Sequence, residues 1–282
     1  MPLTAENVQE LRRTADRVRA LVIETVHGAK AGHIGGPLSM AEIVTTLYFH
    51  VLKIDPARPR WEERDRFVLS KGHAAVGLYA TLALRGYFPP AELKTFDKLD
   101  SRLQAHPDMT ALPGLDMSTG SLGQGLSAAV GMALGAKLKG SAFRTYALVG
   151  DGESQEGQIW EAAAVASRYR LDNLIVFLDC NGLQQFGWSE GERRLPPQDE
   201  SLAGKWRAFG WAVHSIDGHD PAQIVQAAEA ARETSGRPTA VIARTRKGRG
   251  VSFMEGNYEW HARIPTDQEL QAALAELGVN GR

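Results

Sequence analysis

The segment that most constrains the fold is residues 146–187, which reads as strand, acidic turn, helix, second strand and polar turn. The apolar run 146–149 ends in a Gly-Asp-Gly turn, and the apolar run 174–178 ends in an Asp-Cys-Asn-Gly turn. A helical pattern between them indicates a βαβ unit, whose parallel strands often lie side by side. We therefore expect Asp151 and Asn181 at the same edge of one sheet, on neighbouring or near-neighbouring strands.

This shared edge predicts a ligand site, because open α/β sheets bind ligands at the carboxyl ends of their strands. One carboxylate, one amide oxygen and a nearby backbone carbonyl form an all-oxygen set that suits Mg²⁺, which completes its shell with water and phosphate oxygens. The segment thus predicts a magnesium–diphosphate site. The competing interpretation is an ordinary βαβ unit, because Gly-Asp-Gly and Asn-Gly are both good turn sequences.

Helix and strand patterns alternate along the chain. Helical periodicity appears at residues 7–27, 39–52, 74–85, 123–139, 155–169 and 221–234, and strand-like runs appear at 67–70, 145–149, 173–179, 211–217 and 239–245. The alternation predicts an α/β fold with a doubly wound, mostly parallel sheet and helices on both faces. We expect one domain over residues 1–265 and a C-terminal helical tail over 266–282, which Thr266 and Glu269 would open as a capping box.

Composition excludes several classes of partner. The 282 residues carry a formal net charge of -1, so the protein has no overall positive charge that would attract nucleic acid or an anionic membrane. No apolar run approaches the length that spans a bilayer. The single cysteine, Cys180, excludes an intramolecular disulfide framework and fits a reducing compartment. We expect a cytoplasmic protein without nucleic-acid or membrane partners.

Histidines divide into two groups. Four lie in irregular segments with glycine, polar or basic neighbours: His33, His73, His106 and His261. Four sit inside or beside predicted elements and are interpreted as structural: His27, His50, His214 and His219. A cluster of loop imidazoles suits polyhydroxy substrates, whose hydroxyl protons must move near pH 7. A zinc site is the alternative, but no HExxH, CxxC or HxxxH spacing supports it.

The segment 118–127 is rich in glycine and serine and precedes a helix of small residues. Free N–H groups at a helix start bind anions. The segment is neither a Walker A loop nor a GxGxxG fingerprint, and glycine runs also serve close helix packing. Beside a magnesium–diphosphate site we interpret it as one wall of that site.

Taken together, these motifs resemble transketolase over residues 7–262, and the Gly-Asp-Gly turn followed by Asn181 resembles the thiamine diphosphate signature. The motifs stand in this order: GHIGGPLS at 32–39, SKGH at 70–73, His-Pro at 106–107, STGSLGQG at 118–125, GDGESQEG at 150–157, NGLQQFG at 181–187, DGHD at 217–220 and KGRGVSFMEGNYEWH at 247–261. Any one motif could arise by chance, whereas their order and combination are specific.

The resemblance covers only the diphosphate-binding module of that family, because 282 residues leave no room for its pyrimidine-binding and C-terminal modules. It implies the thiamine diphosphate-binding N-terminal subunit of a split transketolase, with a pyrimidine-module partner in an α2β2 assembly. The implied cofactors are thiamine diphosphate and Mg²⁺, or Ca²⁺ or Mn²⁺ in its place. The implied reaction moves a two-carbon ketol unit between sugar phosphates, and the isolated chain would be inactive.

Site residues follow from the same resemblance. The implied metal ligands are Asp151, Asn181 and the carbonyl of Leu183. The implied catalytic residues are His33, His73, His106 and His261, of which His73 and His261 also contact the cofactor. Further implied cofactor-binding residues are Gly120, Ser121, Leu122, Gly150, Gly152, Glu156, Glu161 and Asn181, where the two glutamates resemble a carboxylate network that crosses the subunit interface.

Two positions depart from the family pattern. Ser121 stands where proline is common, and Ala262 follows His261 where glycine is usual. The second departure bears on the backbone of His261 and thereby on the role that the resemblance implies for this residue.

Two other functions remain open at this stage. The chain resembles, in its Gly-Asp-Gly and Asn turns, the α subunit of a 2-oxo acid dehydrogenase or decarboxylase, or a deoxyxylulose-phosphate synthase-like subunit. The His106-Pro107 pair and the SKGH motif favour transketolase. A non-catalytic relic that binds a partner is opposed by the intact Asp151, Asn181 and four loop histidines.

Overall fold

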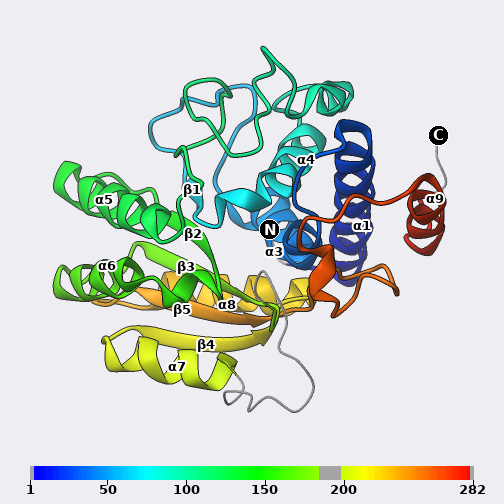
Figure 1. The fold of residues 1–282 in the computed structure, drawn as a ribbon. Coiled ribbons are helices and arrows are strands. Elements are labelled where there is room, and N and C mark those ends of the chain that lie inside the picture. The colour runs from blue at the N-terminus through cyan, green and yellow to red at the C-terminus, as the bar shows by residue number, and fades with distance from the viewer. Residues whose placement is uncertain (1–2, 184–197, 280–282) are drawn as a thin grey trace.

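The computed structural model describes residues 3–183 and 198–279 and shows a five-stranded sheet (Figure 1). The strands lie in the order β1-β2-β3-β5-β4, and all four pairings are parallel. Their bounds are β1 Arg66–Leu69, β2 Thr145–Gly150, β3 Leu174–Cys180, β4 Ala212–Asp217 and β5 Thr239–Arg244. The predicted α/β class is confirmed, and each predicted strand is found within one residue of its expected bounds.

Helices and short helical turns connect the strands. The α-helices are α1 Ala5–Ala29, α2 Gly35–Ser39, α3 Ala41–Thr46, α4 Ala75–Arg85, α5 Gln124–Lys139, α6 Gly157–Arg168, α7 Gln198–Ala208, α8 Pro221–Glu233 and α9 Asp267–Glu276. The π-helix is η1 Leu47–Val51, and the 3-10 helices are η2 Gly72–Ala74, η3 Pro90–Thr95, η4 Glu153–Gln155 and η5 Tyr258–His261. Among the described helices, none is long and apolar enough to cross a membrane.

Two hydrophobic cores lie on opposite faces of the sheet, because side chains alternate along each strand. Tyr146 and Leu148 of β2 pack with α1, α3, α4 and α8, whereas Ala147 and Val149 pack with α5, α6 and α7. Every residue of β3 is buried. Coverage on both faces explains why these strands are continuous apolar runs instead of alternating patterns.

One helical prediction differs from the structure, and one helix was not predicted. The single helix expected at 39–52 is wrong. Helix α2 begins at Gly35, Met40 separates it from α3 with φ -89 and ψ 0, and a short π-helix follows α3. The periodicity could not reveal this, because buried residues on every side of these turns leave no polar face. Helix α7 lies outside the predicted helical ranges; its buried Leu202, Ala203 and Trp206 form only a short apolar stripe.

The C-terminal helix α9 begins with the predicted capping box, in which Glu269 N donates to Thr266 Oγ1 at 3.2 Å and Thr266 N donates to Glu269 Oε2 at 2.8 Å. The helix lies beside α1 (Figure 1), where His27 Nε2 is 2.8 Å from Asp267 Oδ1. Ala273 belongs to the same core as α1. The described part of the tail therefore shares the core of the preceding domain.

Candidate active site

The site is built at the carboxyl ends of β2 and β3, which are direct neighbours with Gly150 opposite Asp179. Asp151 follows β2 and accepts hydrogen bonds from Gly152 N at 2.8 Å and from Gly182 N at 2.9 Å. The second bond crosses to the turn after β3, so the carboxylate joins the two strand ends. The expected proximity of Asp151 to the Asn181 turn is thus present.

Asn181 and Leu183 complete the predicted metal set. Asn181 Oδ1 accepts from Leu183 N at 3.2 Å, and its amide donates to Ser39 Oγ at 3.2 Å. The set offers one carboxylate with amide and carbonyl oxygens. Over residues 3–183 and 198–279, no group of three or more His, Cys, Asp or Glu is arranged to hold a metal, so a metal here would draw on amide and carbonyl oxygens as well.

Asp151 is electrostatically suited to a cation. Burial, reinforced by the nearby Asp179 carboxylate, raises the pKa of Asp151 to about 6. Hydrogen bonds from Gly152 and Gly182 oppose this rise without cancelling it. A buried carboxylate whose charged form is penalised gains most from a divalent ion, which would supply the missing positive charge.

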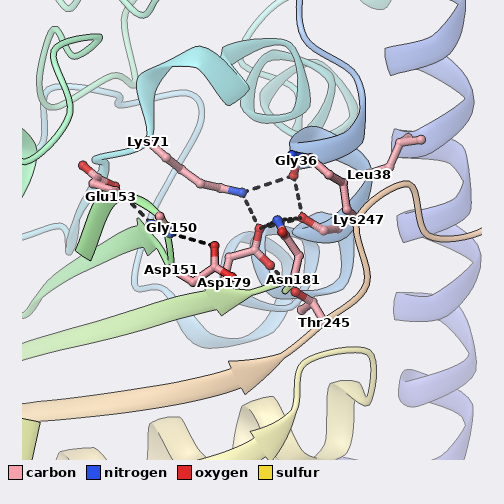
Figure 2. Close-up of polar contacts among 12 residues, drawn as sticks. Gly36, Leu38, Lys71, Gly150, Asp151, Glu153, Asp179, Asn181, Thr245 and Lys247 are labelled. Carbon is pink, nitrogen blue, oxygen red and sulfur yellow. Dashed lines mark hydrogen bonds and ion pairs between the residues drawn. The ribbon is translucent and has the colours of Figure 1, made fainter. Parts of the chain in front are cut away.

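A buried ion pair that the sequence did not reveal lies next to Asp151 (Figure 2). Lys71 Nζ contacts Asp179 Oδ2 and donates to Gly36 O at 3.2 Å, and Ser39 Oγ donates to the same carboxylate at 2.6 Å. Thr245 Oγ1 contacts the other oxygen of Asp179. Burial favours a higher pKa for Asp179, but the Lys71 charge and these bonds outweigh it and lower the pKa.

This pair joins segments from α2, β1, β3 and β5 at the floor of the site. The one signal in the sequence was a charged residue, Asp179, within the otherwise apolar run of β3. A charge buried in such a run requires a partner, but the sequence alone could not identify Lys71 as that partner.

The four predicted loop histidines come together. The ring centroids of His33, His73 and His261 are 5.0–5.4 Å apart pairwise. His106 lies against Gly120, where an added Cβ would be 3.0 Å from His106 Cδ2. These histidines line one cavity of about 390 Å³. Its other lining residues are Gly36, Lys71, Gly120, Leu122, Gly150, Asp151, Gly152, Glu153, Asn181, Leu183 and Lys247.

Two glycines allow the loops to meet closely. A Cβ at Gly35 would lie 2.8 Å from both Lys247 Cγ and the Trp260 carbonyl oxygen, and a Cβ at Gly72 would lie 2.6 Å from Gly120 N. Larger residues there would separate the segments that carry the histidines. The glycine-rich motifs are therefore needed for packing as well as for ligand access.

Three of the histidine rings are neutral near pH 7. Burial, followed by the Lys71 charge, lowers the pKa of His73 to about 2. Burial, followed by Lys247, lowers the pKa of His261 to about 3. Burial, followed by His106, lowers the pKa of His33. A neutral imidazole can offer one donor and one acceptor to a ligand, and the ammonium groups of Lys71 and Lys247 lie in the same lining.

Lys247 is a cavity residue that the sequence places only in a basic loop. Its Nζ lies 3.0 Å from His261 Nδ1 and donates to Leu183 O at 3.3 Å. Burial lowers the pKa of Lys247 to about 8. Lys247 thus lies between the predicted metal set and the histidine cluster.

Glu153 is the buried carboxylate of the GDGESQEG motif. It accepts from Gly150 N at 3.0 Å, Gly123 N at 2.9 Å and Ser70 Oγ at 2.6 Å, and thereby holds the glycine-rich segment against the strand ends. Burial raises its pKa in spite of these bonds.

Three predicted cofactor residues lie away from the cavity lining. Ser121, Glu156 and Glu161 are exposed and do not line it. Gly120, Leu122, Gly150 and Gly152 do line it, although Gly152 N donates its hydrogen bond to Asp151 here. Of the NGLQQFG motif, residues 184–187 lie outside the described part of the chain.

Comparisons with known proteins agree on one family. Residues 11–282 match the family model described as transketolase, thiamine diphosphate binding domain. The chain is 47% identical over 277 residues to the 6-deoxy-6-sulfo-D-fructose transketolase subunit SqwG of Clostridium sp. (strain MSTE9), covering 98% of this chain and 99% of that protein. It is 44% identical over 269 residues to a subunit of the apulose-4-phosphate transketolase of Actinobacillus succinogenes, covering 95% of this chain and 96% of that protein.

Solved structures give the same result. The transketolase of Campylobacter jejuni superposes with a TM-score of 0.88 at 34% identity, covering 96% of this chain and 43% of that one. The chain therefore spans about two fifths of the length of that solved transketolase, but nearly the whole length of the two subunit relatives.

Proposed function

The chain belongs to the transketolase family, in its thiamine diphosphate-binding part, and on this premise we propose that it is the N-terminal subunit of a two-chain transketolase. It transfers a two-carbon ketol unit from a ketose to an aldose together with a partner subunit. The observation that carries the proposal is one cavity that combines the oxygen set of Asp151, Asn181 and Leu183 with four histidines.

The residues present fit a magnesium-bound diphosphate. Asp151 is a buried carboxylate with a raised pKa, and Lys71 and Lys247 place positive charge on the same cavity. We assign Asp151, Asn181 Oδ1 and the Leu183 carbonyl to Mg²⁺, with Ca²⁺ or Mn²⁺ as substitutes. We assign His73, Lys247 and the Gly152 amide to the diphosphate, and the backbone of Gly120 and Leu122 to the aminopyrimidine.

Thiamine diphosphate, when bound, supplies the nucleophilic carbon and the electron sink needed to break a C–C bond beside a carbonyl. The protein supplies orientation and proton handling. Lys247 donates to His261 Nδ1, which leaves the His261 proton on Nε2. His261 therefore acts as a hydrogen-bond donor, and we assign removal of the sugar hydroxyl proton to neutral His33, a step worth ~10²–10⁴-fold.

His106 takes the remaining catalytic position. It lies against Gly120 in the lining of the same cavity as His33, His73 and His261. We propose that it hydrogen-bonds hydroxyl groups of the sugar. Imidazoles from separate segments of the chain can bind a polyhydroxy chain at more than one point.

A second chain completes the site. We propose a partner that carries the pyrimidine module, in an α2β2 assembly, and a cytoplasmic location in keeping with the single, buried Cys180. The exposure of Glu156 and Glu161 supports their assignment to a carboxylate network across the interface instead of to this chain's own cavity. Ser121, also exposed, is assigned to the same rim.

The donor is proposed to be a ketose with an anionic group at its far end. The 47% identical relative is named for 6-deoxy-6-sulfo-D-fructose, and two others for apulose 4-phosphate. Sulfonate and phosphate are both terminal anions, so a set of ketoses that differ only in this group identifies the substrate class.

Calorimetric titration of the two-chain complex with thiamine diphosphate and Mg²⁺ tests the cofactor assignment. Saturable binding that is lost in Asp151→Ala, with an unchanged assembly by size-exclusion chromatography, supports it. Equal affinity in the wild type and Asp151→Ala would refute the metal assignment.

A further inference from the structure

The loop after β5, residues 245–250, separates two cavities. Lys247 lines the front cavity that contains the histidines, whereas Arg249 and Gly250 line a second cavity of about 440 Å³ behind the loop. The second cavity is also lined by Arg12, Asp16, Arg19, Glu42, His219, Ser252, Glu255, Glu276 and Leu277. Lys247 itself is packed against Gly35, whereas the residues on the side of the second cavity have hydrogen bonds that can be identified one by one.

His219 supplies one of these bonds from the rear. Its Nε2 accepts a hydrogen bond from Arg246 N at 2.9 Å, one residue before Lys247. A backbone N–H can only donate, so Nε2 is unprotonated and the ring proton resides on Nδ1. That proton is donated to Glu42 Oε2, 2.9 Å away.

Glu42 is itself fixed by a buried cation. Arg19 Nη2 lies 2.5 Å from Glu42 Oε2, and the Arg19 side chain is only 2% exposed. Arg19 also donates to Leu38 O at 3.2 Å. The chain of contacts therefore runs from α1 through Glu42 of α3 to the imidazole of His219, and from there to the backbone of the Lys247 loop.

Other hydrogen bonds hold the loop elsewhere. Gly248 N donates to Gly35 O at 3.1 Å, Gly256 N donates to Lys247 O at 2.9 Å and Gly250 N donates to Glu255 Oε1 at 3.0 Å. Thr245 Oγ1 contacts Asp179. Arg246 N, which bonds His219, lies between the anchors at Thr245 and Gly248 and adjoins the residue that reaches the cavity.

We propose that His219 is a positioning residue of the ketol-transfer site: it holds the Arg246 amide so that Lys247 Nζ stays at His261 Nδ1 and at the Leu183 carbonyl. This inference rests on the proposed function, because it gives Lys247 a ligand to bind. His219 does not itself line the front cavity.

A purely local role in the turn is served by other atoms. The turn before α8 uses the backbone N–H of His219, which donates to Asp217 Oδ1 at 2.9 Å, and α8 is capped by Asp220, which accepts from Ala222 N at 3.2 Å. Both bonds survive any substitution of the imidazole. The role of the ring can thus be tested separately from the turn.

Two variants separate the two ring nitrogens. His219→Gln retains an acceptor near the Nε2 position for Arg246 N, and His219→Asn retains a donor near the Nδ1 position for Glu42 but removes that acceptor. Both are compared in the two-chain complex. One measurement is deuterium uptake of the peptide that contains residues 245–250, and the other is affinity for thiamine diphosphate with Mg²⁺.

We expect His219→Asn to speed exchange in this peptide and to weaken cofactor affinity by up to about tenfold, with His219→Gln within about threefold of the wild type, because the Arg246 amide loses its imidazole acceptor only in the first and a net hydrogen bond contributes about 1 kcal/mol. Equal behaviour of the two variants would overturn the proposal. Faster exchange with unchanged affinity would also overturn it, since the loop would then be anchored without positioning Lys247.

Failure of the proposed function has a different signature. In that case the wild-type complex itself shows no cofactor affinity, and Asp151→Ala changes nothing. If instead Asp151→Ala abolishes binding and both His219 variants match the wild type, the proposed function stands and the role of His219 is refuted.

Discussion

Lys247 Nζ lies 3.0 Å from His261 Nδ1, although the loop that carries Lys247 and the turn that carries His261 are separated along the chain. This contact fixes the tautomer of His261 and places a positive charge beside it. Burial, and then this charge, holds the pKa of His261 at about 3. The pair therefore keeps a neutral imidazole with an Nε2–H donor in the cavity.

Removing the Lys247 charge should raise the pKa of His261. In Lys247→Met we expect the pKa to rise from about 3 but to remain below 6.5, because burial persists. Histidine titration followed by NMR measures this directly. Lys139→Met, at an exposed position near the end of α5, is the matched control and should leave His261 unchanged. An unaltered pKa in Lys247→Met would contradict the assigned contact.

Asp151→Asn should stabilise the metal-free protein while weakening Mg²⁺ binding. Burial raises the folded-state pKa of Asp151 to about 6 from 3.8, so the charged form destabilises the fold above pH 6, and this penalty fades as the pH falls toward 4. At pH 7.5, Asp151→Asn should raise the free energy of unfolding by up to about 3 kcal/mol. Urea unfolding in EDTA measures it, and a less stable Asp151→Asn at pH 7.5 would count against the account.

Lys71→Met should destabilise the fold by about 3–5 kcal/mol, because it leaves the fully buried Asp179 carboxylate without its cation. The double variant Lys71→Met/Asp179→Asn should recover part of this loss, since no net charge then remains buried at the pair. Urea unfolding of the single and double variants gives the coupling energy. Additive effects would show that the two side chains do not interact.

Glu42→Gln should reduce the loss of folding stability that the wild type shows as the pH falls below 4.5. Burial opposes ionisation of Glu42, but Arg19 and His219 outweigh it and lower its pKa to about 2 from 4.5. The ionised Glu42 carboxylate therefore adds roughly 3 kcal/mol to the free energy of unfolding. This contribution is fully present above pH 4.5 and is lost as the pH falls toward 2. Unfolding of Glu42→Gln and the wild type at pH 3 and pH 6 tests this; Glu10→Gln, in the exposed pair with Arg13, should change little. Parallel profiles for Glu42→Gln and the wild type would contradict it.

The parts of the site that the sequence predicted are those that follow a strong local pattern. Asp151 and Asn181 directly follow uninterrupted apolar runs, so the geometry of a parallel sheet places them at one edge. The glycine-rich loops identified which histidines would face a ligand. The α9 capping box was also local, since Thr266 and Glu269 bond each other three residues apart.

The parts that were missed depend on tertiary contacts. The partner of Asp179 is Lys71, more than one hundred residues earlier, and no spacing rule joins them. Lys247 reaches the cavity because Gly35 leaves room for its side chain. The sequence predicts that His219 belongs to a turn, and its backbone N–H does form a hydrogen bond within that turn. Its ring, however, bonds the distant Glu42 and Arg246, which no local pattern could indicate.

Ketol transfer by the purified chain, with and without a pyrimidine-module partner, tests the central claim most directly. Aldose formation from a ketose phosphate and from 6-deoxy-6-sulfo-D-fructose would be followed in the presence of thiamine diphosphate, Mg²⁺ and an acceptor aldose. We predict no turnover by the chain alone and turnover by the two-chain complex that is abolished in Asp151→Ala. Robust turnover by the chain alone, or undiminished turnover by the complex with Asp151→Ala, would contradict the account.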